Sequence, residues 1–284
     1  METVDIIKEC MEKISDADIV LLGFGPEFNI KTSDILDQTP LYKELDIQGM
    51  PLDDLEKKWI EYTLVKISID SIECKIRSEA LNIYNSLDEH LRKLNKTNYF
   101  VVTTCNDDII WDSTFDKDRI VAPLGTMDLM KCEKGCFKTV YQTEEVYNHI
   151  YDIIQKYKNE DDKTHMYDEL KEAMPQCPMC KQVMSANLYK TSNYSAEGYR
   201  EAWDTYTAWL QKTLNRKLVM IELGEGFETP TVIRWPFEKV AAVNNKSTLI
   251  RVNKNFWQIA EDIEGKALPV KMSGKEFVWR LTNG

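Results

Sequence analysis

The chain has 284 residues, and its 43% hydrophobic content is enough to build a sizeable buried core in one large domain or two ordinary ones. Its 36 Lys and Arg residues against 47 Asp and Glu residues give a formal net charge of -11. Because this charge repels nucleic-acid backbones and anionic lipid surfaces, we expect neither nucleic acid nor a membrane as a partner.

Residues 1–15 place apolar side chains at helical spacing, so they predict an amphipathic helix. The charges are spread through this segment, which lacks the basic region, the continuous apolar run and the small-residue cleavage site of a signal peptide. No apolar stretch approaches the roughly 18 residues that a membrane span needs. We therefore expect a cytoplasmic protein.

Two buried strands are expected in the first part of the chain, at residues 19–22 and 99–102. The first ends at Gly23-Phe24-Gly25-Pro26, where glycine permits a tight turn and proline ends strand pairing. Between the strands, apolar residues step by three or four from 53 to 94, which favours two helices over one. The second strand ends in the polar string 103–108.

The last part of the chain predicts a helix at 199–214, whose aromatic stripe is expected in the core, and strands at 217–223 and 248–253. Strands that alternate with helices indicate the α/β class: a Rossmann-like parallel sheet flanked by helices, with ligand sites outside the carboxyl ends of the strands. We assign residues 1–120 and 200–284 to this lobe. Residues 121–199 are assigned to a small zinc-binding lobe inserted into it.

Four cysteines in the insertion form the most specific pattern in the sequence. Cys132 and Cys136 are separated by three residues, and Cys177 and Cys180 by two. Two such pairs match the four thiolates of a structural, tetrahedral Zn²⁺ site, which leaves no open position for a reacting water. The alternative is four unrelated buried cysteines. Cys105 follows the second strand, where a reactive thiol is a further possibility.

The order of these segments resembles the sirtuin family: a strand with a glycine turn, a strand ending in Thr-Thr-x-x-Asp, a four-cysteine insertion, a strand ending in Gly-x-Gly and a last strand ending in Ile-Arg-Val-Asn. Cys177-Pro178-Met179-Cys180 with Asn187-Leu188, and the segment from Glu222 to Phe227, are similar to the microbial macrodomain-linked (class M) branch. The resemblance implies a fold that binds NAD as a consumed substrate, and it covers residues 16–255.

The resemblance implies a set of site residues. Asn106 and Asp107 would take the catalytic positions. The cofactor-binding positions are Gly23, Gly25, Thr103, Thr104, Gly224, Glu225 and Asn253. The chain also departs from the family pattern at several of its positions. Pro26 and Glu27 replace small loop residues, Cys105 replaces a ribose-binding Asn, and Leu124 stands at the general-base position, where it cannot accept a proton.

Three functions remain open at this point. The first is a sirtuin-like NAD-dependent protein ADP-ribosyltransferase or deacylase relative with weak or altered activity, acting on a protein substrate. The second is a catalytically inactive pseudo-sirtuin that senses NAD or ADP-ribose, or that presents a surface to a protein partner. The third is a zinc-bearing structural domain unrelated to sirtuins. Whether the chain is an enzyme depends on the departures at Leu124, Cys105 and Glu27.

Overall fold

The computed structural model describes residues 3–71 and 74–283, which form two compact units. The sheet unit comprises Met1–Asn29, Glu79–Leu124 and Tyr199–Gly284, and the cysteine unit comprises Ile30–Ser78 and Gly125–Gly198. Residues 30–78, which the sequence assigns to the Rossmann-like lobe, therefore lie in the other unit. The reason is visible at Trp59, whose ring packs 5.7 Å from that of Tyr147 and whose Nε1 donates to the Met184 carbonyl at 2.7 Å.

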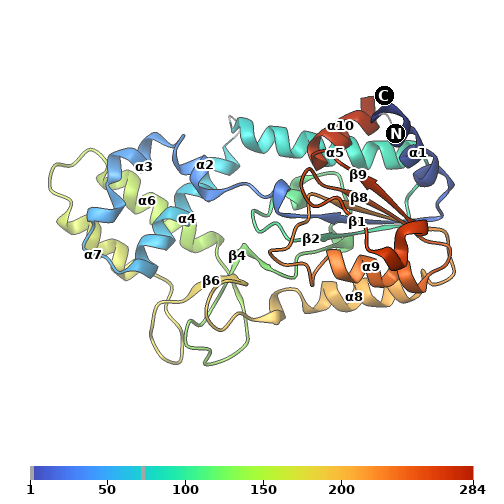
Figure 1. Cartoon of the computed structure of the whole chain (residues 1–284). Helices are drawn as coiled ribbons and strands as arrows, with labels where there is room; N and C mark the ends of the chain where they lie inside the picture. Colours follow the sequence, from blue (N-terminus) through green and yellow to red (C-terminus); the bar gives the residue numbers. More distant parts are fainter. Residues whose placement is uncertain (1–2, 72–73, 284) are drawn as a thin grey trace. The chain divides into compact units, whose positions relative to one another are not determined.

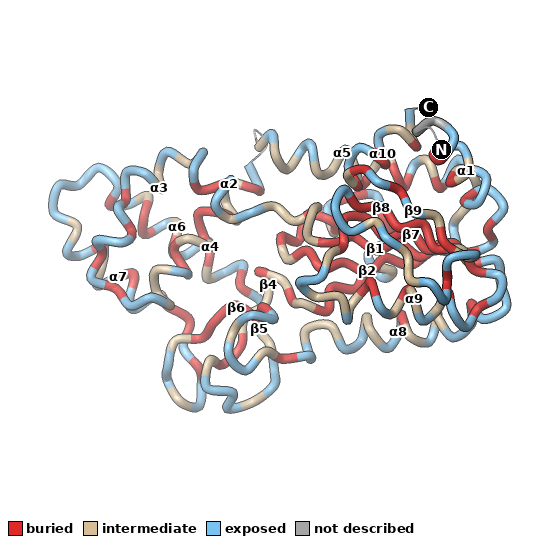
Figure 2. The backbone as a smooth tube through the Cα atoms, viewed as in Figure 1, coloured by how far each residue is buried: buried red, intermediate tan, exposed pale blue. Residues whose placement is uncertain are grey.

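The sheet unit is built on six parallel strands in the order β3-β2-β1-β7-β8-β9, which confirms the expected Rossmann-like α/β class (Figure 1). The strands are β1 (Ile19–Phe24), β2 (Tyr99–Thr103), β3 (Ile120–Val121), β7 (Leu218–Leu223), β8 (Thr248–Val252) and β9 (Ala267–Val270). Every residue of β1, β2 and β7 is buried, as parallel strands covered on both faces require (Figure 2).

Helices cover both faces of this sheet (Figure 1). One face carries α1 (Thr3–Asp16), α5 (Lys75–Lys93) and α10 (Gly274–Asn283), and the other carries α8 (Arg200–Gln211) and α9 (Arg234–Val243). The aromatic stripe of α8 belongs to the core as expected, because the Tyr206 and Trp209 rings lie 5.3 and 5.5 Å from the Phe100 ring. The helical region expected from 53 to 94 is indeed two helices, α4 (Asp54–Asp70) and α5.

The strand order places a topological switch point between β1 and β7. From β1 the chain moves outward through β2 to β3, and it later returns to the other side of β1 and moves outward through β7, β8 and β9. At such a point the loops leaving two neighbouring strands run in opposite directions, which opens a crevice at the carboxyl ends of the strands. The loops after β1 and β7 are therefore where a ligand site is expected.

The cysteine unit combines a small antiparallel sheet with helices. Its strands, in the order β5-β4-β6, are β4 (Gly125–Lys131), β5 (Tyr141–Gln142) and β6 (Ser185–Leu188). Its helices are α2 (Thr32–Leu36), α3 (Pro40–Leu45), α4, α6 (Glu144–Tyr157) and α7 (Thr164–Ala173). Short 3-10 helices complete the two units: η1 (Pro26–Phe28), η2 (Ile47–Gly49), η3 (Ile109–Asp112), η4 (Lys117–Arg119), η5 (Ala196–Gly198) and η6 (Glu261–Lys266).

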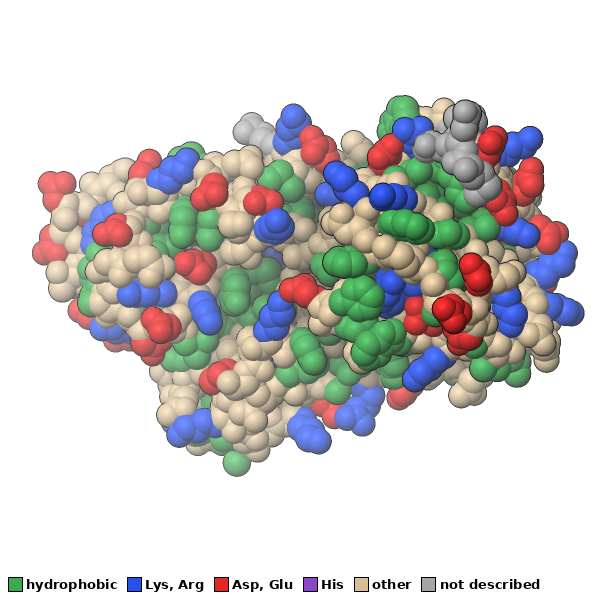
Figure 3. Space-filling view, in the orientation of Figure 1, with side chains coloured by type: hydrophobic (Ala, Val, Ile, Leu, Met, Phe, Trp, Pro, Cys, Tyr) green, Lys and Arg blue, Asp and Glu red, His purple; other side chains and the backbone are tan. Residues whose placement is uncertain are grey.

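The surface carries charges of both signs. On the face drawn in Figure 3, Lys and Arg side chains are interspersed with Asp and Glu side chains. Within the described residues, every helix is too short or too polar to cross a bilayer.

Candidate functional site

The four cysteines of the insertion converge in the cysteine unit. The Sγ atoms of Cys132, Cys136, Cys177 and Cys180 all lie within 4.8 Å of one another, and those of Cys132 and Cys180 are 3.8 Å apart. A tetrahedral ion with metal–sulfur bonds of about 2.3 Å places its sulfurs roughly 3.8 Å apart, so this cluster fits Zn²⁺. Although burial raises the pKa of Cys132, backbone N–H groups and the neighbouring thiols lower it to about 6, which favours the metal-binding thiolate.

Lys131, which the sequence reasoning missed, is buried beside the cluster. Its Nζ atom lies 3.0 Å from a carboxylate oxygen of Glu133 and 2.7 Å from the Ser185 hydroxyl, and it also donates to the Ser192 carbonyl. A buried ammonium group is tolerated only with such partners. No spacing rule could have found Lys131, because two of its partners, Ser185 and Ser192, lie more than fifty residues further along the chain.

A cavity of about 600 Å³ opens at the carboxyl ends of β1, β7, β8 and β9, where the switch point predicts a ligand site. It is lined by Pro26, Glu27, Gly224, Gly226, Phe227, Glu228, Asn253, Lys254, Asn255, Phe256 and Ser273. Phe227 and Phe256 contribute exposed aromatic rings whose centroids are 5.3 Å apart, edge to face. Apolar rings beside a few polar groups are typical of small-molecule sites.

Two of the predicted glycines make the loops of this cavity possible. A Cβ atom on Gly25 would lie 2.5 Å from the backbone of Glu225, so the ends of β1 and β7 approach each other closely only with glycine there. Gly224 has φ +65, and a Cβ atom on it would lie 2.5 Å from the Glu27 Cβ. Both glycines therefore shape the wall of the cavity.

Glu27 turns its carboxylate toward α10. Its Oε2 accepts a hydrogen bond from the Gly274 backbone N–H at 3.0 Å, and its Oε1 accepts one from that of Lys275 at 3.4 Å. These N–H groups belong to the first turn of α10, where the helix dipole favours a negative charge. The side chain expected to oppose a phosphate thus serves as a helix cap at the edge of the cavity.

The polar string after β2 caps backbone groups at the same edge of the sheet. The Thr103 hydroxyl accepts from the Cys105 N–H at 3.0 Å, and Asp107 Oδ1 accepts from the Ile109 N–H at 3.2 Å. The Asn106 N–H donates to Asn29 Oδ1 at 2.8 Å. Burial raises the pKa of the Cys105 thiol well above its usual range, which disfavours the reactive thiolate.

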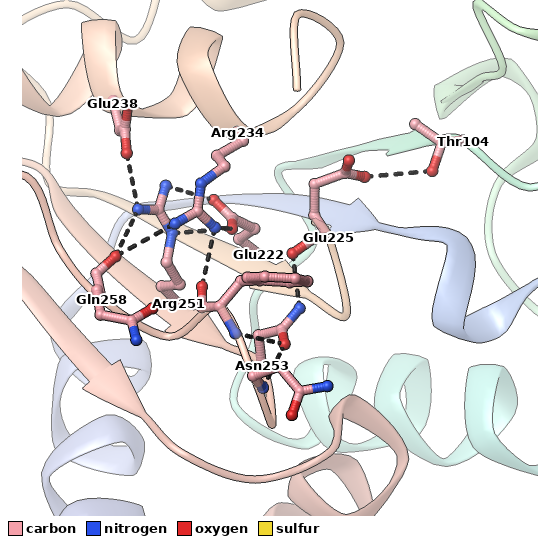
Figure 4. A network of polar contacts seen from close by, with 10 residues as sticks. Thr104, Glu222, Glu225, Arg234, Glu238, Arg251, Asn253 and Gln258 are labelled. Carbon is pink, nitrogen blue, oxygen red and sulfur yellow. Dashed lines mark hydrogen bonds and ion pairs between the residues drawn. The ribbon is translucent and has the colours of Figure 1, made fainter. Parts of the chain in front are cut away.

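Asn253 and Glu225 join the ends of β8 and β7. Asn253 Nδ2 donates to the Glu225 carbonyl at 2.6 Å, and its Oδ1 accepts from the backbone N–H groups of Asn255 and Phe256 at 2.8 and 2.9 Å. The Glu225 carboxyl points away from Asn253 toward Thr104, whose hydroxyl lies 3.2 Å from Oε2 (Figure 4). Asn253 therefore sets the shape of the loop that carries Phe256.

A network of buried ion pairs lies next to the loops that line the cavity (Figure 4). Glu222 binds Arg251 through both carboxylate oxygens, at 2.8 and 2.9 Å, and Arg234 at 3.2 Å. Arg251 also binds Glu238 at 2.7 Å. Arg234 donates to the Phe256 carbonyl at 2.9 Å. The sequence reasoning quoted these residues as part of a similar segment but assigned them no role.

Leu124, the residue at the expected general-base position, is half-buried directly before β4 and brings no proton acceptor. Of the histidines, His90 lies on α5, and His149 and His165 lie on α6 and α7 of the cysteine unit. The predicted site residues of the sheet unit thus lie at the carboxyl ends of its strands. The segment that follows β3, residues 122–124, contains no histidine.

The sequence is similar to that of two curated proteins, and no family model matches it. It is 22% identical over 172 residues to "Protein ADP-ribosyltransferase" of Staphylococcus aureus, covering 60% of this chain and 51% of that protein. It is 28% identical over 161 residues to "Probable bifunctional ADP-ribose hydrolase/ADP-ribosyltransferase" of Fusarium oxysporum f. sp. cubense, covering 54% and 25%. The chain thus spans about half the length of the first relative and a quarter of the second.

Solved structures show the same fold over nearly the whole chain. A structure described as the structural basis of sirtuin substrate affinity matches with a TM-score of 0.52 and 15% identity, covering 96% of this chain and 97% of that one. A complex of a Sir2 homolog with NAD also gives a TM-score of 0.52, at 9% identity, covering 97% and 92%. The chain therefore has the sirtuin fold, and its sequence is similar to those of protein ADP-ribosyltransferases.

Proposed function

We propose that the chain binds NAD, through its ADP-ribose part, in the cavity at the β1–β7 switch point, as a sirtuin-like protein ADP-ribosyltransferase or deacylase relative with weak or altered activity. The observation that carries this proposal is the 600 Å³ cavity, because its walls come from the loops after β1, β7, β8 and β9. The similarity to the two ADP-ribosyltransferases supports it, and so does the solved complex of a Sir2 homolog with NAD.

The cavity fits the parts of such a nucleotide in turn. The Phe227 and Phe256 rings offer aromatic contact to a base, and exposed Lys254 offers a positive charge. A diphosphate would lie beside the backbone of Gly224 and Gly226, which line the cavity, and Asn253 holds the opposite loop. Gly23, Gly25, Thr103 and Thr104 would support these loops from below, because Gly25 packs against the Glu225 backbone and both threonines are buried. Asn106 and Asp107 would take the catalytic positions.

Departures from the family pattern argue for reduced activity. Loss of a positioned general base typically costs about 10²–10⁴-fold in rate, and Leu124 carries no proton acceptor. Glu27 adds a carboxylate to the cavity wall, which opposes a diphosphate through charge repulsion. These residues favour a second candidate, a pseudo-sirtuin that binds the nucleotide as a sensor or presents a surface to a protein partner.

We propose further that the four-cysteine cluster holds a structural zinc ion. Four thiolates complete the tetrahedral coordination, so the metal would hold together the two segments that carry the cysteine pairs, residues 132–136 and 177–180. It would leave no position for an activated water.

Two measurements test the nucleotide proposal. Calorimetry with ADP-ribose should give saturable binding, weakened about 10-fold by Phe256→Ala, which removes an aromatic wall, and unchanged by Leu214→Ala, an exposed apolar residue outside the cavity. Incubation with NAD and candidate acceptor proteins should release nicotinamide slowly if the chain is an enzyme. Binding without release would favour the sensor, and no binding at all would overturn the nucleotide proposal and leave only the pseudo-sirtuin that presents a surface to a protein partner.

A further inference from the structure

Two exposed aromatic rings form a corner in the cavity. Phe227 follows β7 and Phe256 follows β8, and both residues line the cavity. Their ring centroids lie 5.3 Å apart with an interplanar angle of 85°, so the rings stand nearly perpendicular to each other. The two residues are 57% and 42% exposed, although large apolar side chains gain free energy by burial. Rings left open to a cavity in this way are available to a ligand with a flat surface.

One buried guanidinium group contacts both of these residues. The Arg234 Cζ atom lies 4.5 Å from the centroid of the Phe227 ring, in a cation–π contact. Its Nη1 donates a hydrogen bond to the Phe256 carbonyl at 2.9 Å. Arg234 thus joins the loop after β7, through the Phe227 side chain, to the loop after β8, through the Phe256 backbone.

Arg234 is itself held in place by the sheet unit. It is the first residue of α9 and is only 4% exposed. Its Nη1 also lies 3.2 Å from the Glu222 carboxylate, and its Nη2 donates to the Gln258 carbonyl at 3.3 Å (Figure 4). A guanidinium group is planar and its donors point in fixed directions, so these bonds define its orientation. A fixed guanidinium can in turn fix the two aromatic residues that it contacts.

We propose that Arg234 is a positioning residue, which holds Phe227 and Phe256 as a preformed corner for the flat base of a nucleotide. A base stacked on one ring would meet the other ring nearly at a right angle, so stacked and edge-to-face contacts are both available. Preformation raises affinity because the ligand does not have to order the two rings on binding. This inference rests on the nucleotide proposed above, and it assigns part of the affinity to a residue that does not line the cavity.

The geometry of Arg234 can be separated from its charge. A buried positive charge would attract a diphosphate whether or not it contacts the aromatic rings. Arg234→Lys keeps this charge and can keep the ion pair with Glu222. It lacks the planar fork that lies over the Phe227 ring while it bonds the Phe256 carbonyl. Weaker binding by this variant therefore reports the lost geometry.

The experiment is calorimetry of the full chain with ADP-ribose, for the wild type, Arg234→Lys, Phe227→Leu and the combined variant. Each single change should raise the Kd about 5- to 20-fold, because each removes the cation–π contact. The combined variant should bind only about 2- to 3-fold more weakly than Phe227→Leu, since only the bond to the Phe256 carbonyl remains to be lost. Arg280→Lys, the same substitution at an exposed pair on α10, should leave the Kd unchanged. Thermal unfolding of each variant checks that it is folded.

The outcomes separate this inference from the proposed function. If the wild type does not bind ADP-ribose, both are overturned. If the wild type binds but folded Arg234→Lys binds equally well, or if the two single effects simply add, the inference alone is overturned. Should Arg234→Lys fail to fold, Phe227→Leu is compared with Phe227→Trp, which keeps a ring over Arg234. Binding about 5-fold tighter by Phe227→Trp would support the inference, and equal binding would overturn it.

Discussion

The Glu27 carboxylate accepts a hydrogen bond from the Gly274 backbone N–H at 3.0 Å, which ties the loop after β1 to the first turn of α10. The same side chain lines the cavity at the switch point. One carboxylate thus stabilises the fold and adds a negative charge where a diphosphate is proposed to bind.

Replacing the Glu27 carboxylate should therefore lower the stability of the fold and, at the same time, tighten the binding of ADP-ribose. Glu27→Ala removes the acceptor at the start of α10 and should lower the free energy of unfolding by about 1 kcal/mol, measured by urea denaturation. It should also tighten ADP-ribose binding severalfold, because a repelling charge is lost. Glu264→Ala is the control: it removes an exposed carboxylate outside the cavity, and we expect neither the stability nor the binding to change. Weaker ADP-ribose binding by folded Glu27→Ala would contradict this account.

Removal of the proposed zinc should unfold the cysteine unit. Cys177→Ser replaces a buried thiol of the cluster, so we expect the zinc content, measured by elemental analysis, to fall from about one ion per chain toward zero. The melting temperature should drop as well, because binding of a structural metal contributes directly to folding. Cys74→Ser changes a cysteine outside the cluster and should leave both values unchanged. A purified wild-type chain without metal would disprove the zinc site.

The buried pair of Arg251 and Glu222 should be among the most sensitive positions in the sheet unit. Arg251→Met leaves Glu222 in the core without its bidentate partner, so we expect a loss of about 3–5 kcal/mol in the free energy of unfolding. Arg280→Met breaks an exposed i,i+4 pair with Glu276 and should cost at most about 0.5 kcal/mol. Urea denaturation of the two variants compares them. Equal, small losses would show that the network does not hold the cavity loops.

Protonation of Glu225 should make stability depend on pH. Its folded pKa of about 8 lies above the ordinary value of 4.5 for a glutamate, so between these values the folded chain binds a proton that the unfolded chain releases. Stability therefore falls as pH rises through this window, with a slope of at most about 1.4 kcal/mol per pH unit from this group. Unfolding measured from pH 5 to pH 9 should show a shallower decline in Glu225→Gln, and identical profiles would contradict the buried, protonated state.

Much of the sheet could be predicted because its strands are short, continuous apolar runs. The strand predicted at 217–223 matches β7, and the one at 19–22 falls two residues short of β1 because Gly23 suggested an earlier end. Gly23 lies within the strand, where a Cβ atom would come within 2.6 Å of Ile233. The strand β9 was missed, since Pro269 argues against a strand and is tolerated here only at the sheet edge.

Which helices and strands pack against one another was harder to predict than the helices and strands themselves. The periodicity of α4 shows that one of its faces is buried, but nothing local tells that Tyr147 of α6 covers Trp59. The cysteine spacing predicted convergence of the thiols because metal ligands constrain distant segments to meet. By contrast, the cap that Glu27 provides to α10 and the charge network around Arg251 depend on tertiary contacts that leave no spacing in the sequence.

A crystal structure of the chain with ADP-ribose tests the central claim most directly. The account predicts electron density for the nucleotide in the cavity between residues 224–228 and 253–256, in contact with the Phe227 and Phe256 rings. Density for ADP-ribose at another place on the chain, or an empty cavity at saturating nucleotide, would contradict it.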